Sequence, residues 1–256
     1  MYQIKAYIKF LLRATNQHGV HSPFVYHFVT KCLYDKTTHE AYAKLKRYKS
    51  ELRSSNTILQ ITDLGEGSKT LDTQQRAVGK MAKISSSSIK DAKLLYRVST
   101  YFTIKMGLEL GTSLGMGTYA LALADTNAQF TTIEGCPNTA AFTKSKLKQH
   151  QIKNIKFLVG DFSKSILELK EGHYDLVFFD GHHNKEATIA YFETLLPKAH
   201  NDSVFVFDDI YWSKEMTEAW TYIKTHNAVK VTVDTFHLGF VFFRREQAKE
   251  HFKIRM

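Results

Sequence analysis

The sequence predicts an α/β fold with a mostly parallel sheet, a C-terminal antiparallel hairpin and a helical N-terminal extension. Three observations support this prediction. An apolar strand at 103–110 runs into a glycine-rich loop and then into a helix of small residues at 119–124. Strands and helices alternate after it, as in parallel sheets with covered faces. The chain then changes to two strands joined by a tight connection at 236–239.

The expected elements follow from periodicity and from start and stop signals. The first hundred residues contain mainly helical patterns, at 3–14, 23–33, 38–54 and 88–102. Further strands are expected at 130–133, 155–159, 174–179 and 203–207, and the hairpin strands at 229–235 and 240–244. Helices are expected between the strands at 138–150, 163–170, 185–196 and 213–226. Pro137 favours a helix start at that point.

Charge divides the chain into two regions. The sequence carries 35 Lys and Arg against 25 Asp and Glu, a formal net charge of +10, and the excess lies wholly within residues 1–100. We therefore predict a basic, mainly helical N-terminal cap region at 1–100 and a separate α/β domain at 101–256. A basic cap can steer an anionic acceptor, such as RNA, a nucleotide-linked sugar or a coenzyme A ester. A well-solvated surface is an equally weighted alternative.

The glycine-rich loop indicates a nucleoside cofactor. Glycine lets the backbone approach a ligand, and the following helix N-terminus offers free N–H groups. The expected contacts are Glu109 at the strand end and the loop residues Gly111, Thr112, Ser113 and Gly115. Glu134 follows 25 residues after Glu109, at the end of the next strand, where an acid can accept from ribose hydroxyls. An ordinary tight turn is the alternative interpretation of the loop.

The loop pattern Glu109-x-Gly111-x-x-x-Gly115 resembles the first motif of class I S-adenosylmethionine-dependent methyltransferases. A dinucleotide pattern also begins at Gly115, but it lies five residues beyond the strand end, and the terminal hairpin favours the methyltransferase fold over NAD binding. The resemblance implies a Rossmann-like class I methyltransferase sheet over 101–256, which would bind S-adenosylmethionine. It assigns Glu134 to the ribose and Asp161 with Phe162 to the adenine end, while core packing is an alternative for Phe162.

Acidic residues at two further strand ends suggest a metal site. Asp180 follows one buried strand, and Asp208 with Asp209 follows the next. This set resembles the metal-binding acids of O-methyltransferases of the catechol, caffeoyl-coenzyme A and sugar types. The resemblance implies Mg²⁺ or another divalent cation, and Asp180 would lie near both metal and cofactor. Three crowded carboxylates repel one another without a cation, which independently favours a metal.

Histidines beside Asp180 supply a candidate base. His183 lies three residues beyond Asp180, where catechol-type enzymes carry a lysine, and imidazole titrates near neutral pH. We therefore predict His183 and Asp180 as catalytic residues. His182 could serve instead as base or metal ligand, and both histidines could merely line the pocket. Tyr211 and Trp212 could form a substrate wall or pack in the core.

These observations predict a transferase that methylates an oxygen of a small hydroxylated acceptor with the help of a divalent cation. Two alternatives stay open, a metal-independent tRNA or RNA methyltransferase that uses the basic region, and a catalytically silent cofactor-binding module. The sequence 64–67, Leu-Gly-Glu-Gly, imitates a nucleotide loop but is interpreted as a turn.

Location and assembly are predicted from weaker signals. Two cysteines and the lack of a signal peptide or a transmembrane segment favour the cytoplasm. The apolar face of 4–12 predicts packing on the core or on a partner subunit, so a homodimer is among the expectations, with an anionic membrane surface as the alternative.

Overall fold

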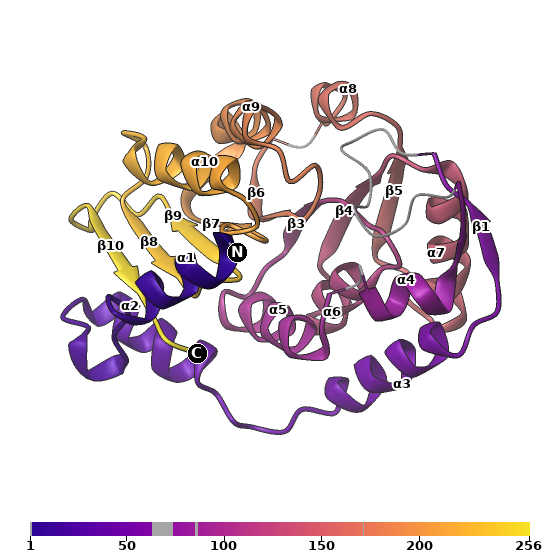
Figure 1. Ribbon diagram of the computed structural model, residues 1–256, viewed down its shortest axis with the longest axis horizontal. Helices are drawn as coiled ribbons and strands as arrows, with labels where there is room; N and C mark the ends of the chain where they lie inside the picture. The colour runs from indigo at the N-terminus through magenta and orange to yellow at the C-terminus, as the bar shows by residue number, and fades with distance from the viewer. Residues whose placement is uncertain (1, 63–73, 85–86, 171) are drawn as a thin grey trace. The chain divides into compact units, whose positions relative to one another are not determined.

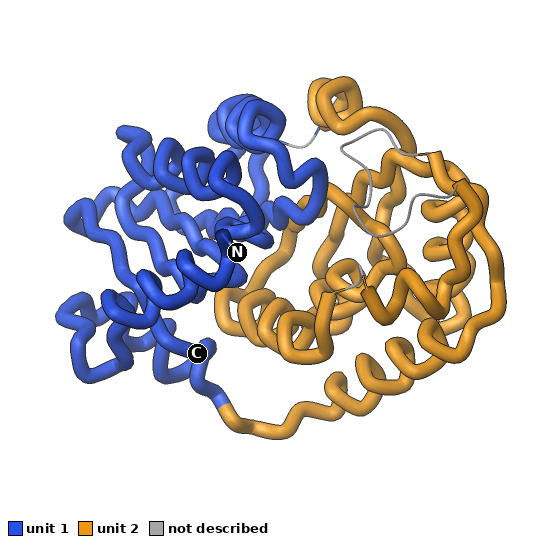
Figure 2. The backbone as a smooth tube through the Cα atoms, viewed as in Figure 1, with its two compact units in different colours: residues 1–35, 170–256 blue, residues 36–169 orange. Residues whose placement is uncertain are grey.

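The computed structural model describes residues 2–62, 74–84, 87–170 and 172–256. The chain forms two compact units (Figure 2), one of residues 36–169 and the other of residues 1–35 together with 170–256. The division predicted at residue 100 follows charge, whereas these units follow contacts, so it stays a prediction. The sequence 64–67 lies outside the described residues, and so do two residues of the Ser85–Ser88 stretch.

Residues 36–169 contain three parallel strands with helices around them (Figure 1). The strands are β3 (Met106–Leu110), β4 (Gln129–Glu134) and β5 (Ile155–Val159), in the order β3-β4-β5. Two short strands that come earlier in the chain, β1 (Ile58–Gln60) and β2 (Gln75–Ala77), pair antiparallel with each other. The helices are α3 (Ala41–Arg53), α4 (Val78–Ile84), α5 (Ile89–Tyr101), α6 (Met116–Ala124), α7 (Pro137–Gln149) and α8 (Phe162–Leu167).

Local signals in the sequence explain the helix starts of this unit. Ser88 and Asp91 form a capping box at the start of α5, in which each side chain accepts from the other residue's backbone N–H. Pro137 opens α7, as expected. Helix α6 is buried over most of its length, and its small residues let it pack closely against α5 and α3. These contacts anchor the helix that follows the glycine-rich loop.

Residues 1–35 and 170–256 form a unit whose strands pair in both parallel and antiparallel directions. Its strands are β6 (Tyr174–Phe179), β7 (Ala199–Phe207), β8 (Val231–Asp234), β9 (Gly239–Phe242) and β10 (Glu250–Lys253), in the order β6-β7-β9-β8-β10. The α-helices are α1 (Tyr2–Leu11), α2 (Pro23–Phe28), α9 (Lys185–Leu195) and α10 (Lys214–Thr225). Short 3₁₀ segments span Gln17–Gly19 and Leu196–Lys198, and a π-helical turn spans Val29–Leu33.

The predicted fold class is confirmed, since the chain is a mixed α/β protein with mostly parallel strand pairs. The predicted hairpin is also present, because β9 pairs antiparallel with both β7 and β8. One detail differs. The strand β10 pairs parallel with β8 outside the hairpin, and its sequence, Glu-His-Phe-Lys, lacks the apolar alternation that predicts a strand.

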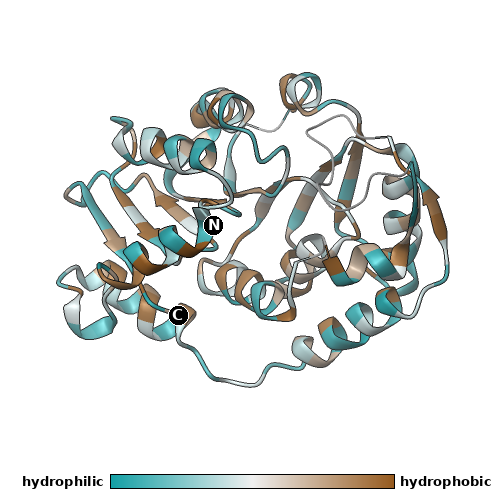
Figure 3. Ribbon diagram, in the orientation of Figure 1, coloured by the Kyte–Doolittle hydropathy of each residue, from teal (hydrophilic) through white to brown (hydrophobic). Residues whose placement is uncertain are grey.

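The helices of the first hundred residues divide between the two units. Helix α2 packs on the hairpin, where Phe24 and Phe28 meet Phe242 and Phe240 with ring centroids 5.0 and 5.2 Å apart. Helices α3 and α5 instead contact α6. Figure 3 shows hydrophobic residues along the strands of both units, in agreement with their buried cores. No helix within the described ranges is long and apolar enough to span a membrane.

Candidate functional site

The glycine-rich loop turns sharply between β3 and α6. Gly111 has φ 102° and Gly115 has φ 75°, in the left-handed region that favours glycine. Ser113 between them also has a positive φ, 47°, which costs energy for a residue with a side chain. The Gly115 N–H donates to the carbonyl of Thr112 at 2.8 Å, which closes the turn. The loop is therefore a defined backbone structure at the carboxyl end of β3.

Glu134 lies beside this loop at the end of β4. Its Oε2 accepts from the Ser113 N–H at 2.7 Å, and its Oε1 accepts from the Cys136 N–H at 2.9 Å. Both carboxylate oxygens are thus oriented by backbone donors. The structure brings together Glu134 and the glycine-rich loop, as a nucleoside site requires.

Glu109 points into the protein. It is 2 % exposed, and its Oε2 accepts from the hydroxyls of Thr118 and Thr132, the latter at 2.7 Å. Burial raises the pKa of Glu109 to about 7, although the two threonine hydrogen bonds oppose the shift. The hydroxyls of Thr112 and Thr132 are 2.5 Å apart and extend this network to the loop. Glu109 therefore reaches the loop through threonines.

Asp161 and Phe162 begin α8 after β5. The Asp161 carboxylate accepts from the Lys164 N–H at 3.2 Å and so caps this helix. Phe162 is 7 % exposed. The cap gives Asp161 a structural role, and the burial of Phe162 favours the packing alternative for that residue.

The acidic loops of the other unit begin at matched points of two paired strands. β6 and β7 run parallel, with Phe179 opposite Phe207, so Asp180 and Asp208 start their loops at the same level. The Asp208 N–H donates to the carbonyl of Phe179 at 2.9 Å and continues the pairing by one step. The structure thus confirms that the strands before these two acids are neighbours.

His183 lies between two of the three carboxylates. Its Nε2 is 4.0 Å from Asp180 Oδ1 and 4.0 Å from Asp209 Oδ2. Asp209 has φ 51°, and its N–H donates to Asp208 Oδ1 at 2.9 Å, which joins the two consecutive acids. A residue other than glycine in the left-handed region has a strained backbone, and such strain is often found at functional sites. Two acids and an imidazole therefore converge at the ends of β6 and β7.

The donor atoms suit a hard divalent cation, but they are not gathered around one point. Carboxylate oxygens are the ligands that Mg²⁺ prefers. Within the parts of the chain that the structure describes, no group of three or more His, Cys, Asp or Glu residues is arranged to hold a metal ion. The residue types and strand placement fit a metal site, and its closure would need the side chains of Asp180, Asp208 and Asp209 to rotate toward one another.

The second histidine and the aromatic pair take different positions. His182 has φ 52°, and its Nδ1 lies 2.7 Å from the hydroxyl of Tyr191. Tyr211 is buried and donates to Asp234 Oδ2 at 2.6 Å, whereas Trp212 is 40 % exposed with its ring centroid 6.2 Å from that of His183. Of the predicted substrate wall, only Trp212 lies by the acidic loops as a partly open side chain.

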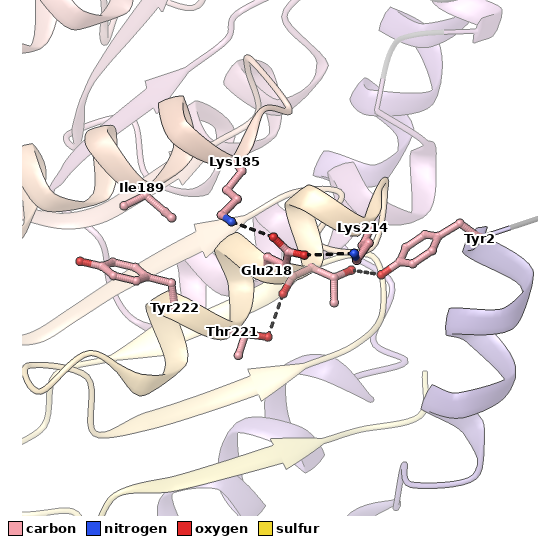
Figure 4. A pocket seen from close by; sticks show the side chains of 8 residues that line it. Tyr2, Lys185, Ile189, Lys214, Glu218, Thr221 and Tyr222 are labelled. Carbon is pink, nitrogen blue, oxygen red and sulfur yellow. Dashed lines mark hydrogen bonds and ion pairs between the residues drawn. The ribbon is translucent and has the colours of Figure 1, made fainter.

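A pocket of about 570 Å³ lies between the first turns of α9 and α10 and the start of α1 (Figure 4). Lys185 and Lys214 line it, two residues beyond His183 and Trp212 respectively. Both lysines pair with Glu218, at 2.7 and 3.7 Å. The single Glu218 carboxylate offsets only one of these two positive charges, so the pocket keeps a small net positive charge.

The buried residues that form hydrogen bonds to the glycine-rich loop or to Glu109 were not predicted from the sequence. These are Thr118, Thr132 and Thr143 with Tyr48, and all four are buried. A signal existed for Thr132, which lies on the strand that follows the loop and pairs with Glu109 in the parallel register. Tyr48 and Thr143 lie on helices, where a single sequence gives no indication of the partner.

Comparison with known proteins identifies the central part of the chain. Residues 108–210 match the sequence model of a family described as a methyltransferase domain. These residues are a methyltransferase domain. The domain includes the glycine-rich loop, Glu134 and all three acids of the β6 and β7 loops. The comparison with curated proteins returned no match.

Solved methyltransferases share this fold. SAH-bound methyltransferase PaMTH1 from Podospora anserina has a TM-score of 0.61 at 14 % identity, over 88 % of this chain and 97 % of that one. Cofactor-bound Rv0187 from MTB has a TM-score of 0.59 at 17 % identity, over 84 % and 96 %. The O-methyltransferase TomG from Streptomyces achromogenes, in complex with SAM, has a TM-score of 0.58 at 16 % identity, over 84 % and 96 %. The predicted class I methyltransferase fold is confirmed.

Proposed function

We propose that this methyltransferase domain transfers a methyl group from S-adenosylmethionine to an oxygen of a small hydroxylated acceptor, with the help of a divalent cation. One observation carries the proposal. A single domain match spans a glycine-rich loop flanked by an oriented acid and a second set of acids at paired strand ends. Solved proteins of the same fold, such as TomG in complex with SAM, support the choice of cofactor and of oxygen as acceptor.

In this proposal the glycine-rich loop and Glu134 bind the cofactor. Backbone groups of Gly111, Thr112, Ser113 and Gly115 would contact the cofactor, and the Glu134 carboxylate would accept from the ribose hydroxyls. Asp161, which also caps α8, and the buried Phe162 would contact the adenine end. Glu109 stabilises the loop through its threonine network. S-adenosylmethionine would supply the methyl group as an activated sulfonium.

Asp180, Asp208 and Asp209 would hold the cation in the proposed site. When bound, a divalent cation lowers the pKa of an acceptor hydroxyl and orients its oxygen. The three carboxylates also gain from a cation, because crowded negative charges repel one another. Trp212, partly exposed beside His183, would contact the acceptor.

His183 would accept the proton of the acceptor hydroxyl. Its Nε2 lies 4.0 Å from carboxylate oxygens of Asp180 and of Asp209, which places the imidazole beside the proposed metal site, where the acceptor hydroxyl would bind. His182 is less suited to this role, since its Nδ1 is within hydrogen-bond distance of the Tyr191 hydroxyl.

The basic region at 1–100 is proposed to steer an anionic acceptor. It carries the whole formal net charge of +10, and long-range attraction of this kind depends on ionic strength. The expected sign is an apparent KM for an anionic acceptor that rises with salt, while the affinity for the cofactor changes little.

Calorimetric titration with S-adenosylhomocysteine, with and without Mg²⁺, tests the proposal on wild type and on Asp208→Ala. We expect cofactor binding in both proteins and a separate Mg²⁺ isotherm that Asp208→Ala lacks. Asp202→Ala is the matched control, since Asp202 lies on β7, the strand that Asp208 follows, but pairs with Arg244 on the surface.

Each result has a distinct meaning. Cofactor binding without a Mg²⁺ isotherm, repeated with a vicinal diol present, would contradict the metal and favour the RNA alternative. No cofactor binding by the wild type would contradict the function itself.

A further inference from the structure

Two consecutive carbonyls of the glycine-rich loop are held by side chains from two different helices. The carbonyl of Ser113 accepts from the Thr143 hydroxyl of α7 at 2.7 Å. The carbonyl of Leu114 accepts from the Tyr48 hydroxyl of α3 at 2.8 Å. These bonds are made from the side of the loop opposite to solvent, since Tyr48, Thr143 and Leu114 are all fully buried. Loop carbonyls held in this way have a fixed direction.

Tyr48 is itself locked in place by the surrounding aromatic residues. Its ring lies against Tyr119 of α6 with centroids 4.7 Å apart, and against His150 with centroids 5.0 Å apart. Glu51, one turn further along α3, accepts from Lys146 at 2.8 Å and from His150 at 2.9 Å. These ion pairs connect α3 with α7 and its C-cap residue His150. Together with the ring contacts, they fix the position of the Tyr48 hydroxyl at the loop.

The same two side chains lie against Gly115. A Cβ atom added to Gly115 would lie 2.6 Å from Thr143 Cγ2 and 3.0 Å from the Tyr48 hydroxyl. The loop therefore fits between α3 and α7 with no space for a side chain. The steric fit and the two hydrogen bonds are separate observations, and both involve Tyr48 and Thr143. We call these two side chains the clamp of the loop.

We propose that Tyr48 and Thr143 are positioning residues that hold the loop in its cofactor-binding conformation before the cofactor arrives. The inference rests on the proposed cofactor binding and adds a residue outside the matched domain, because Tyr48 precedes residue 108. A pre-organised loop binds more tightly, since no binding free energy is spent on ordering it. The N-terminal region would thus act on the cofactor as well as on the acceptor.

Single substitutions that remove one hydroxyl test the clamp. Tyr48→Phe and Thr143→Val each release one loop carbonyl, and we expect each to weaken S-adenosylhomocysteine binding about tenfold by calorimetry. Thr143→Ser keeps the hydroxyl and should restore binding to within about twofold. In steady-state kinetics the KM for S-adenosylmethionine should rise while kcat at saturating cofactor stays near the wild-type value, because a bound cofactor orders the loop.

Tyr42→Phe is the matched control. Tyr42 lies on the same helix, is 7 % exposed and accepts from Arg97 at 3.3 Å, so its hydroxyl is also used in structure but not at the loop. We expect Tyr42→Phe to lower the melting temperature in the same way as Tyr48→Phe yet to bind the cofactor with wild-type affinity. Equal loss of affinity in both variants would show general loosening of α3 and would overturn the proposal.

The remaining outcomes are also decisive. If the wild type binds the cofactor and both Tyr48→Phe and Thr143→Val bind it within twofold, the clamp is rejected while the proposed function stands. If the wild type does not bind, the proposed function has failed instead. Should Tyr48→Phe fail to fold, the comparison of Thr143→Val with Thr143→Ser decides alone, because these two variants differ at the loop in whether the hydroxyl is present.

Discussion

The glycine-rich loop of one unit and the acidic loops of the other are built in opposite ways. The loop at 111–115 has side-chain partners for the Ser113 N–H and for two successive carbonyls, and Leu114 at its centre is fully buried. The acidic loops leave their side chains partly open, with Asp180 20 %, His183 31 % and Asp209 33 % exposed. The glycine-rich loop is thus held by hydrogen bonds from within the protein. The acids and His183 of the acidic loops lie near one another, but in the described residues they do not surround a common point.

This difference follows from what each site is proposed to bind. A neutral backbone loop can be fully hydrogen-bonded without a ligand at no electrostatic cost. Three carboxylates cannot converge without a cation, because their mutual repulsion and desolvation oppose it. We therefore expect substitutions at the loop to change stability and cofactor affinity, and substitutions at the acidic loops to change metal binding and activity with little change in stability.

Gly115→Ala should have the largest effect. The residue has φ 75°, and a Cβ would lie 2.6 Å from Thr143 Cγ2, so both backbone strain and overpacking act. We expect a loss of about 3 to 4 kcal/mol in the free energy of unfolding and no measurable cofactor binding. Urea denaturation and calorimetry measure these. Gly172→Ala is the control, since an added Cβ there meets nothing within 4 Å, and an equal loss in both variants would contradict the close fit.

Glu109→Gln should remove a pH dependence of stability. The folded-state pKa of Glu109, about 7, lies above its ordinary value of 4.5 because of burial. The stability that the protonated acid contributes is therefore fully present below pH 4.5 and is lost as the pH rises through 7. We expect the wild type to lose about 3 kcal/mol over this range relative to the variant. Denaturation of the cofactor-free protein at pH 4.5, 6 and 8 measures it, and parallel curves for the two proteins would refute the assignment.

His183→Gln should lower kcat about 100-fold at neutral pH, because it removes the proposed proton acceptor. Stability should change little, since the side chain is partly exposed and its nearest carboxylates are 4.0 Å away. The measurement is initial rates with saturating cofactor. His200→Gln serves as the control, as His200 pairs with Asp175 at 2.9 Å and lies near the start of β7. If His183→Gln lowers stability but leaves kcat unchanged, the expectation that the acidic loops act in catalysis and not in stability is wrong.

Glu51→Gln should have the smallest effect. Hydrogen bonds from Lys146, and then from His150, hold the pKa of Glu51 at about 2, yet its side chain is 30 % exposed. Its contribution is present above pH 4.5 and is lost as the pH falls toward 2. Screening by solvent limits the loss in Glu51→Gln at pH 7 to about 0.5 to 1 kcal/mol. Urea denaturation at low and high salt measures it against the exposed Glu168→Gln, and a loss unaffected by salt would contradict a screened ion-pair network.

Local patterns were sufficient for most elements because their causes are local. The strand at 155–159 and the strand at 174–179 are present with the predicted bounds, and Pro137 opens α7 as expected. The two strands of the terminal hairpin were recognised from their short connection. The strand β10 was missed because its pairing with β8, and not its composition, makes it a strand.

The candidate site shows the same division. Acids at strand ends were predictable, because parallel strands bring their carboxyl ends to one edge. The direction in which each acid points was not. Glu109, inside β3, turns inward to Thr118 and Thr132, while Glu134, the last residue of β4, accepts from the Ser113 N–H.

The sequence by itself determined most of the strands and helices, the position of the glycine-rich loop and the acids at the strand ends. These depend on periodicity, on glycine's access to positive φ and on turn chemistry within a few residues. Only the tertiary structure decided which buried groups support the loop. Tyr48 reaches Leu114 across 66 positions of sequence, and such a contact depends on how helices pack, which no local pattern records.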